Sequence, residues 1–268
     1  MRRLTASALF LLALVAWAAG APSAGEPPPL AAAYLLQVQG RTVWAEHAER
    51  RLLPASLTKI MTALLVLEAD RPDEIVTVSR QAAGERGARL GLAAGDRMRV
   101  RDLLTATVVR SANDACHALA EWRAGSQARF VQLMNRRAKA LGLGNTRFAN
   151  ACGLDAPRHY TSAADLAALT RVALGFPAFK ALVRETAVRV ETADGRREFL
   201  LTSTNALLGR MPGAIGVKTG FTRGAGPCVV ALAEREGVEV LLVLLNARNR
   251  WWDADRILEY GFSLADKR

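Results

Sequence analysis

The segment 54–69, PASLTKIMTALLVLEA, is the most informative part of the 268-residue sequence. Its apolar residues recur at helical spacing behind Pro54, so the pattern predicts a helix. Ser56 is the natural cap at the start of that helix. Lys59 follows Ser56 by three residues, which places both side chains on the same face. A hydroxyl and an amine are therefore expected side by side at the start of an apolar helix.

A serine next to a lysine can form an activated nucleophile. The hydroxyl becomes reactive only when a neighbouring base takes its proton, and the lysine amine can be that base only when it is neutral. Burial and a second nearby cation both lower the pKa of a lysine, and Lys218 is the candidate for that cation. The N–H group of Ser56, at the helix start, is also available to a developing oxyanion.

A second motif, Ser111-Ala112-Asn113, lies about fifty residues after Ser56, in a predicted break between helices. Side chains in such a break can protrude into a cleft. The Ser111 hydroxyl could relay a proton to a leaving amine, and the Asn113 amide could hold Lys59 and a substrate carbonyl together. Residues 203–205 also fit the Ser-x-Asn pattern, and spacing alone does not exclude them.

The third motif, Lys218-Thr219-Gly220, ends a predicted strand about a hundred residues further on. A cation and a hydroxyl at Lys218 and Thr219 could hold a substrate carboxylate, and Gly220 would let a substrate backbone approach closely. Each motif alone is common in proteins. The ordered set of three is what indicates a catalytic site.

The rest of the chain has strand patterns at both ends and helical patterns between them. This order predicts an α+β domain in which strands from the two termini form one antiparallel sheet. Residues 145–160 are rich in turn formers and predict a long surface loop, and Ser162 is the expected cap of the helix after it. The predicted strands are 31–39, 42–45, 187–192, 215–218, 228–233 and 238–245, and the further predicted helices are 100–109, 114–122, 128–141, 163–174 and 252–260.

The N-terminal segment predicts export. Arg2 and Arg3 precede an apolar run over residues 9–19, which is short for a membrane span, and small residues follow it. We expect residues 1–25 to be a signal peptide and leader, and residues 26–268 to be a single catalytic domain. An uncleaved anchor is the alternative. The predicted location is the periplasm or cell envelope.

The formal charge of +11 raises the possibility of a nucleic-acid partner. The arginines are scattered, aromatic residues make up only 6% of the chain, and the protein is expected to be exported, so no nucleic-acid partner is predicted. The three cysteines, Cys116, Cys152 and Cys228, allow at most one disulfide. We interpret all three mainly as small buried hydrophobic residues.

The three motifs, in this order and context, resemble those of the low-molecular-mass penicillin-binding proteins, the D-alanyl-D-alanine carboxypeptidases of the serine peptidase type. The resemblance covers about 230 residues, from roughly Ala31 to Phe262. Its matching segments are 54–62, 95–96, 101–104, 111–115, 130–135, 140–143, 145–148, 153–155, 160–163, 165–167, 216–222 and 225–226.

The resemblance implies a penicillin-binding-protein-like transpeptidase fold, with helices on both sides of the sheet, and a role for each motif residue. The implied nucleophile is Ser56, its base is Lys59, and Ser111 is the proton relay. The implied substrate-binding residues are Asn113, Lys218, Thr219 and Gly220, with the N–H groups of Ser56 and Phe221 as the oxyanion hole. The family also places an arginine near the terminal carboxylate; Arg248 is the best match for it, and Arg250, two residues further on, is the alternative.

The implied reaction removes the terminal D-alanine from peptidoglycan stem peptides ending in D-Ala-D-Ala, through an acyl-enzyme. β-Lactams would acylate Ser56, and no metal or other cofactor is expected. Many relatives carry His in place of Phe221, where only the backbone N–H is needed. Many also continue into a β-rich domain and an anchoring helix; this chain ends at Arg268, so no stable membrane anchor is expected after signal cleavage.

Several alternatives use related chemistry. A class A β-lactamase would need a deacylating glutamate before the Lys-Thr-Gly strand, and residues 123–180 contain no Glu. A D,D-endopeptidase that cuts cross-links would use the same residues, and an idle envelope peptide-binding protein would keep the fold without the activity. A Ser-His-Asp hydrolase lacks its Gly-x-Ser-x-Gly motif here, and no His-Glu-x-x-His metal motif occurs. The sequence leaves open the third residue of the stem peptide, the signal cleavage site and the oligomeric state.

Overall fold

The computed structural model of the protein describes residues 31–265. The predicted signal peptide and leader lie outside the described residues. Within them, no helix is long and apolar enough to cross a membrane.

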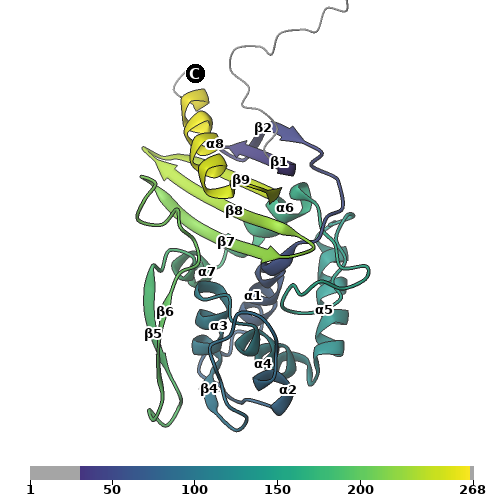
Figure 1. Ribbon diagram of the computed structural model, residues 1–268, viewed down its shortest axis with the longest axis vertical. Helices are drawn as coiled ribbons and strands as arrows, with labels where there is room; N and C mark the ends of the chain where they lie inside the picture. The colour runs from purple at the N-terminus through teal and green to yellow at the C-terminus, as the bar shows by residue number, and fades with distance from the viewer. Residues whose placement is uncertain (1–30, 266–268) are drawn as a thin grey trace, which may run out of the picture.

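A five-stranded antiparallel sheet joins the two ends of the chain, in the order β2-β1-β9-β8-β7 (Figure 1). β1 pairs with β9, so the N-terminal hairpin extends the sheet formed by the C-terminal strands, as the sequence predicts. β7 is the edge strand at the other side. The strands are β1 (Ala31–Val38), β2 (Arg41–Glu46), β7 (Ala214–Thr222), β8 (Gly226–Arg235) and β9 (Val238–Ala247).

Helices cover both faces of this sheet, which confirms the predicted α+β architecture. Successive residues of a strand point to opposite faces. Leu242 and Leu244 of β9 therefore pack with the C-terminal helix α8 (Arg250–Ala265), whereas Leu241 and Val243 pack with the helical part of the molecule. Figure 1 shows α8 over one face and the helical part extending beyond β7.

The helical part surrounds α1 (Lys59–Leu67), whose residues from Lys59 to Val66 are all buried. A short 3₁₀ turn, η1 (Ala55–Thr58), leads into α1, and β7 and β8 pack against that turn. The other helices are α2 (Arg80–Ala83), α3 (Val100–Val109), α4 (Asn113–Ala124), α5 (Gln127–Ala140), α6 (Ala163–Leu174) and α7 (Pro177–Leu182). Two small two-stranded sheets are formed by β3 (Ile75–Thr77) with β4 (Arg97–Arg99) and by β5 (Ala187–Glu191) with β6 (Glu198–Thr202).

Two local predictions are wrong. Ser56 does not cap a helix: it lies inside η1, where no side chain caps the turn, and its hydroxyl faces Lys59 instead. The segment 218–220 lies within β7 and does not end it, because β7 continues to Thr222 in register with β8. The cap predicted at Ser162 is confirmed, since its side chain accepts a hydrogen bond from the N–H of Asp165.

Candidate active site

The three predicted motifs meet where η1, the turn between α3 and α4, and the edge strand β7 come together. Ser56 lies in η1 and Lys59 is the first residue of α1. Hydrogen bonds connect Lys59 to Ser56 and Asn113, and Lys218 to Ser111. Residues up to 162 apart in the sequence (Ser56 and Lys218) therefore form one cluster.

Lys59 is completely buried, although it is a lysine (0% exposed). Its Nζ lies 3.0 Å from Ser56 Oγ, 2.7 Å from Asn113 Oδ1 and 2.6 Å from the carbonyl oxygen of Cys152. Burial lowers the pKa of Lys59 well below the usual lysine range, and the Lys218 ammonium lowers it further. A neutral amine has two N–H donors and one lone pair. When the two carbonyl oxygens take the donors, the lone pair is left for the Ser56 hydroxyl, which is the geometry of a base.

Lys218 forms a second buried pair, with Ser111. Its Nζ donates to Ser111 Oγ at 2.9 Å and to the carbonyl oxygen of Thr219 at 3.1 Å. Burial lowers the pKa of Lys218 to about 7, with a further contribution from the Arg250 guanidinium. Ser111 adopts a left-handed backbone conformation (φ 63°), which costs free energy for a residue with a side chain and is typical of functional sites. The turn thus holds the Ser111 hydroxyl within hydrogen-bond distance of Lys218, a lysine that can change its charge near neutral pH.

Asn113 opens α4 and connects Lys59 to a loop that follows α2. Its Oδ1 accepts from Lys59, while its Nδ2 donates to the carbonyl oxygen of Arg86. The amide N–H₂ group, expected to meet a substrate carbonyl, has a protein partner here. The next residue, Asp114, accepts from the N–H groups of Leu90 and Gly91 and so fixes the same loop.

Gly220 is required because β7 passes directly against η1. A Cβ at this position would lie 3.0 Å from both the backbone nitrogen of Ser56 and the Cβ of Ala55. The expected close approach at Gly220 is therefore made by the protein itself. Phe221, the next residue, has its side chain mostly exposed (62%) at the end of this edge strand, so its ring is not part of the buried cluster.

The arginine beside β7 is Arg250, whereas the sequence favoured Arg248. Arg250 begins α8 and donates to the carbonyl oxygens of Gly220 at 2.6 Å and Cys228 at 3.3 Å. Arg248 lines the same surface hollow, next to Phe221, but has no hydrogen bond to β7. Thr219, whose hydroxyl exchanges a 2.7 Å hydrogen bond with Thr204, lies on the strand between Lys218 and Gly220. A carboxylate next to Thr219 would face two cations, Lys218 and Arg250.

His159 supports the segment between the serine and the lysine, a role that sequence analysis missed. Its Nδ1 accepts from the N–H of Ala149, so its Nε2 carries the proton and donates to Thr58 Oγ1 at 2.9 Å. Thr58 in turn donates to the carbonyl oxygen of Ala55. Burial lowers the pKa of His159 to about 4, which keeps the ring neutral and this tautomer fixed at physiological pH. A single His in a turn-rich segment carries no pattern that predicts this contact.

Comparison with known proteins gives the family. Residues 26–249 match the model of the peptidase S11 family, described as D-alanyl-D-alanine carboxypeptidase. The chain belongs to this family of serine peptidases. It is 36% identical over 234 residues to DacF of Bacillus subtilis, covering 84% of this chain and 59% of DacF. It is 35% identical over 281 residues to DacC of Escherichia coli, covering 98% of this chain and 69% of DacC.

A solved structure shows the same fold. The crystal structure of the Streptomyces K15 DD-transpeptidase matches with a TM-score of 0.84 and 31% identity, over 89% of this chain and 99% of that chain. This carboxypeptidase family member thus spans nearly the whole of that enzyme but about three-fifths of the length of DacF.

Among residues 31–265, no group of three or more His, Cys, Asp or Glu side chains is arranged to hold a metal ion.

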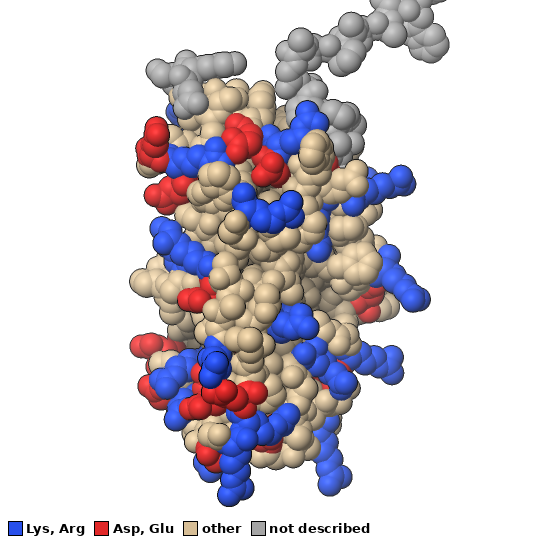
Figure 2. Space-filling view, turned by 60° about the vertical axis from the view of Figure 1, so that its left-hand side comes forward, with Lys and Arg blue, Asp and Glu red and all other residues tan. Residues whose placement is uncertain are grey.

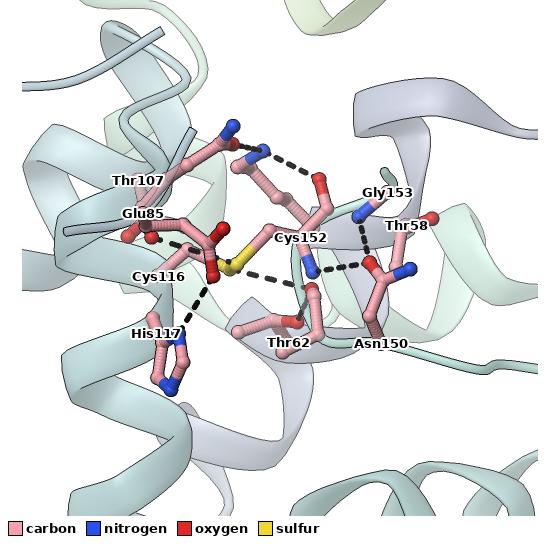
Figure 3. The surroundings of a disulfide bond; sticks show 12 residues. Thr58, Thr62, Glu85, Thr107, Cys116, His117, Asn150, Cys152 and Gly153 are labelled. Carbon is pink, nitrogen blue, oxygen red and sulfur yellow. Dashed lines mark hydrogen bonds and ion pairs between the residues drawn. A yellow bond between two sulfur atoms is a disulfide. The ribbon is translucent and has the colours of Figure 1, made fainter. Parts of the chain in front are cut away.

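A disulfide between Cys116 and Cys152 corrects the prediction that all three cysteines are mainly buried hydrophobic residues (Figure 3). Cys116 lies in α4 and Cys152 lies in the loop that accepts from Lys59, 36 residues further along the chain. The spacing of the two residues gives no sign of the pairing, because it is the fold of the loop that brings them together. Cys228 is a buried free thiol, and burial raises its pKa to about 11.

Proposed function

We propose that this chain is an exported serine D-Ala-D-Ala carboxypeptidase, which removes the terminal D-alanine from peptidoglycan stem peptides and is acylated by penicillins. The observation that carries the proposal is the buried Lys59 amine, 3.0 Å from Ser56 Oγ and with a strongly lowered pKa. A buried, neutral lysine beside a serine supplies the base that a serine nucleophile needs. The family supports the substrate, since its curated relatives are named D-alanyl-D-alanine carboxypeptidases.

Acylation of the enzyme follows from this arrangement. The Ser56 hydroxyl gives its proton to Lys59 as its oxygen bonds to the carbonyl carbon of the penultimate D-alanine. The N–H groups of Ser56 and Phe221 stabilise the oxyanion. When the peptide bond breaks, the leaving amine takes a proton from the Ser111 hydroxyl, which Lys218 supports at 2.9 Å. The proton that Lys59 took from Ser56 then passes to Ser111, so that Lys59 is again a neutral base and Ser111 a hydroxyl. Free D-alanine departs, and the peptide remains as an ester on Ser56.

Hydrolysis of the ester reuses the same base. A water molecule gives a proton to Lys59 and bonds to the ester carbon, and the Ser56 oxygen leaves and regains its proton. The shortened stem peptide is released and the enzyme returns to its starting protonation state. A cross-linked peptide would react by the same steps, with a longer leaving group.

Recognition of the free carboxylate predicts different consequences for the two arginines near β7. Arg250→Leu is expected to raise KM for D-alanine release roughly 10- to 100-fold, because a charge-assisted hydrogen bond to the substrate is lost. Arg248→Leu, its matched control, should change KM less than about twofold, because Arg248 has no hydrogen bond to β7 and surface substitutions without such contacts usually have small effects. Steady-state kinetics on a D-Ala-D-Ala peptide measure both. Equal effects of the two substitutions would contradict the assignment to Arg250.

An oxidising compartment agrees with the disulfide. Disulfides persist in exported proteins and are rare in proteins of reducing compartments, and Cys116–Cys152 is buried in the catalytic region.

The anionic cell envelope also suits the surface charge. Figure 2 shows Lys and Arg spread along the visible face with Asp and Glu between them, which favours diffuse attraction over one basic binding site.

The experiment that tests the function measures free D-alanine released from diacetyl-L-lysyl-D-alanyl-D-alanine by the purified protein and by its Ser56→Ala variant. We expect release by the wild type, a loss of at least about 10,000-fold in the variant, and a penicillin adduct that mass spectrometry maps to Ser56. A cross-linked peptide dimer is assayed in parallel. Cleavage of the dimer without release from the monomer would favour an endopeptidase. The absence of both activities would contradict the proposal.

A further inference from the structure

The disulfide joins the two segments that supply the carbonyl oxygens around Lys59. One oxygen is Oδ1 of Asn113, the first residue of α4, and Cys116 lies one helical turn further along α4. The other is the main-chain carbonyl of Cys152 itself, the second partner in the disulfide. Both cysteines are buried. The bond therefore fixes how far apart α4 and the loop lie at the place where the amine sits between them.

The loop is held to α1 and η1 by separate contacts. Asn150 Oδ1 accepts from the N–H groups of Cys152 and Gly153, and Thr62 of α1 donates to the carbonyl oxygen of Ala151 (Figure 3). Gly153 touches η1 so closely that a Cβ there would lie 1.9 Å from the carbonyl oxygen of Ala55. These contacts set the loop against the serine segment, but they do not set its distance from α4.

We propose that the Cys116–Cys152 disulfide is a positioning element for the catalytic lysine: by fixing α4 against the loop, it keeps both carbonyl oxygens on the two N–H donors of Lys59 and the lone pair on Ser56. The inference rests on the proposed role of Lys59 as the base. It assigns the disulfide an effect on the chemical step in addition to any effect on stability.

The charges around the amine give the direction of a second effect. Lys59 faces Lys218 from β7, Glu85 from the loop after α2, and Asp114 from α4. Burial is the main reason why its pKa is low, Lys218 lowers it further, and the two carboxylates raise it. Without the disulfide, α4 and the loop can separate and admit water, so the pKa of Lys59 should rise. Less of the enzyme would then have a neutral base at a given pH.

The first measurement counts thiols in the denatured wild-type protein. The structure predicts one reactive thiol, Cys228, before reduction and three after a dithiol reductant transfers two electrons and two protons to the disulfide. Three thiols before reduction would overturn the proposal, because no bond would exist to position anything.

The second measurement compares Cys116→Ala, Cys152→Ala and the double variant, at a temperature where circular dichroism shows each to be folded. We expect kcat to fall roughly 10- to 100-fold in all three, with KM within about twofold of wild type. The fall of kcat/KM at low pH, which is the acid limb of its pH profile, should move to higher pH by about one unit. Since one substitution already removes the bond, the double variant should match the singles rather than add their effects.

The control for stability is Leu258→Ala, which removes buried side-chain atoms from α8 on the opposite face of the sheet. It should lower the melting temperature and leave kcat and the acid limb unchanged. The reduced wild type, refolded with the reductant present, repeats the test without a substitution and serves if an alanine variant does not fold.

Cysteine variants with normal kcat and a normal acid limb, but a lower melting temperature, would overturn the proposal and leave the disulfide a purely stabilising bond. This failure differs from failure of the proposed function, in which the wild type itself would release no D-alanine. The rate of acylation by a fluorescent penicillin gives a second readout of Lys59 that needs no peptide substrate.

Discussion

Lys59→Met is expected to lower kcat/KM for D-alanine release by about 10,000-fold while the protein stays folded. The base that takes the Ser56 proton is lost, and general base catalysis contributes up to about this factor. Methionine has a similar length and suits the buried space around the amine stem. The carbonyl oxygens of Asn113 and Cys152 lose a donor, which is expected to cost about 1–3 kcal/mol each in stability. Stopped-flow acylation by penicillin and thermal melting measure the two effects separately.

Lys59→Arg separates the base from the charge. Arginine places a permanent cation at this position, because it cannot give up its proton in a protein. If Lys59 acts as a base, the arginine variant should be as inactive as the methionine variant. Substantial acylation of the Lys59→Arg variant would contradict the role of Lys59 as the base and show that Ser56 needs a positive charge instead.

The part of the site that follows short-range rules was predictable. Ser56 and Lys59 share one turn, and their chemical types indicate a nucleophile and a base before any contact is known. The hairpin at the N-terminus and the long apolar strands near the C-terminus gave the sheet, and the helices 100–109 and 163–174 match α3 and α6. In each of these cases, a local pattern of burial determines the element.

The contacts that complete the site depend on long-range packing and were not predictable. Cys152 acts through its main-chain carbonyl, which every residue type has, so no sequence signal exists for it. His159 comes close to Thr58, and Cys116 comes close to Cys152, only when the turn-rich loop is folded. Arg250 and Arg248 differ by two positions at the start of a helix, and only the direction of α8 distinguishes them.

The pKa of Lys218 predicts how activity depends on pH on the alkaline side of the profile. In the proposed mechanism its ammonium form holds the substrate carboxylate and supports Ser111, and its pKa is about 7 in the free protein. A group that acts in its protonated form loses its effect as the pH rises through its pKa. We therefore expect kcat/KM, which reports the free enzyme, to fall above about pH 7, whereas the neutral form needed at Lys59 produces the acid limb.

Two substitutions of Lys218 test this assignment. Lys218→Arg stays charged at all accessible pH values, so its kcat/KM should lose the alkaline limb, although the larger group lowers the maximum rate. Lys218→Met should lose about 100- to 1,000-fold in kcat/KM, as for one donor removed from a preorganised site. Its acid limb should also move to higher pH, because Lys218 no longer lowers the pKa of Lys59. An alkaline limb that persists unchanged in Lys218→Arg would mean that another group titrates there. A stationary acid limb in Lys218→Met would mean that burial alone keeps Lys59 neutral.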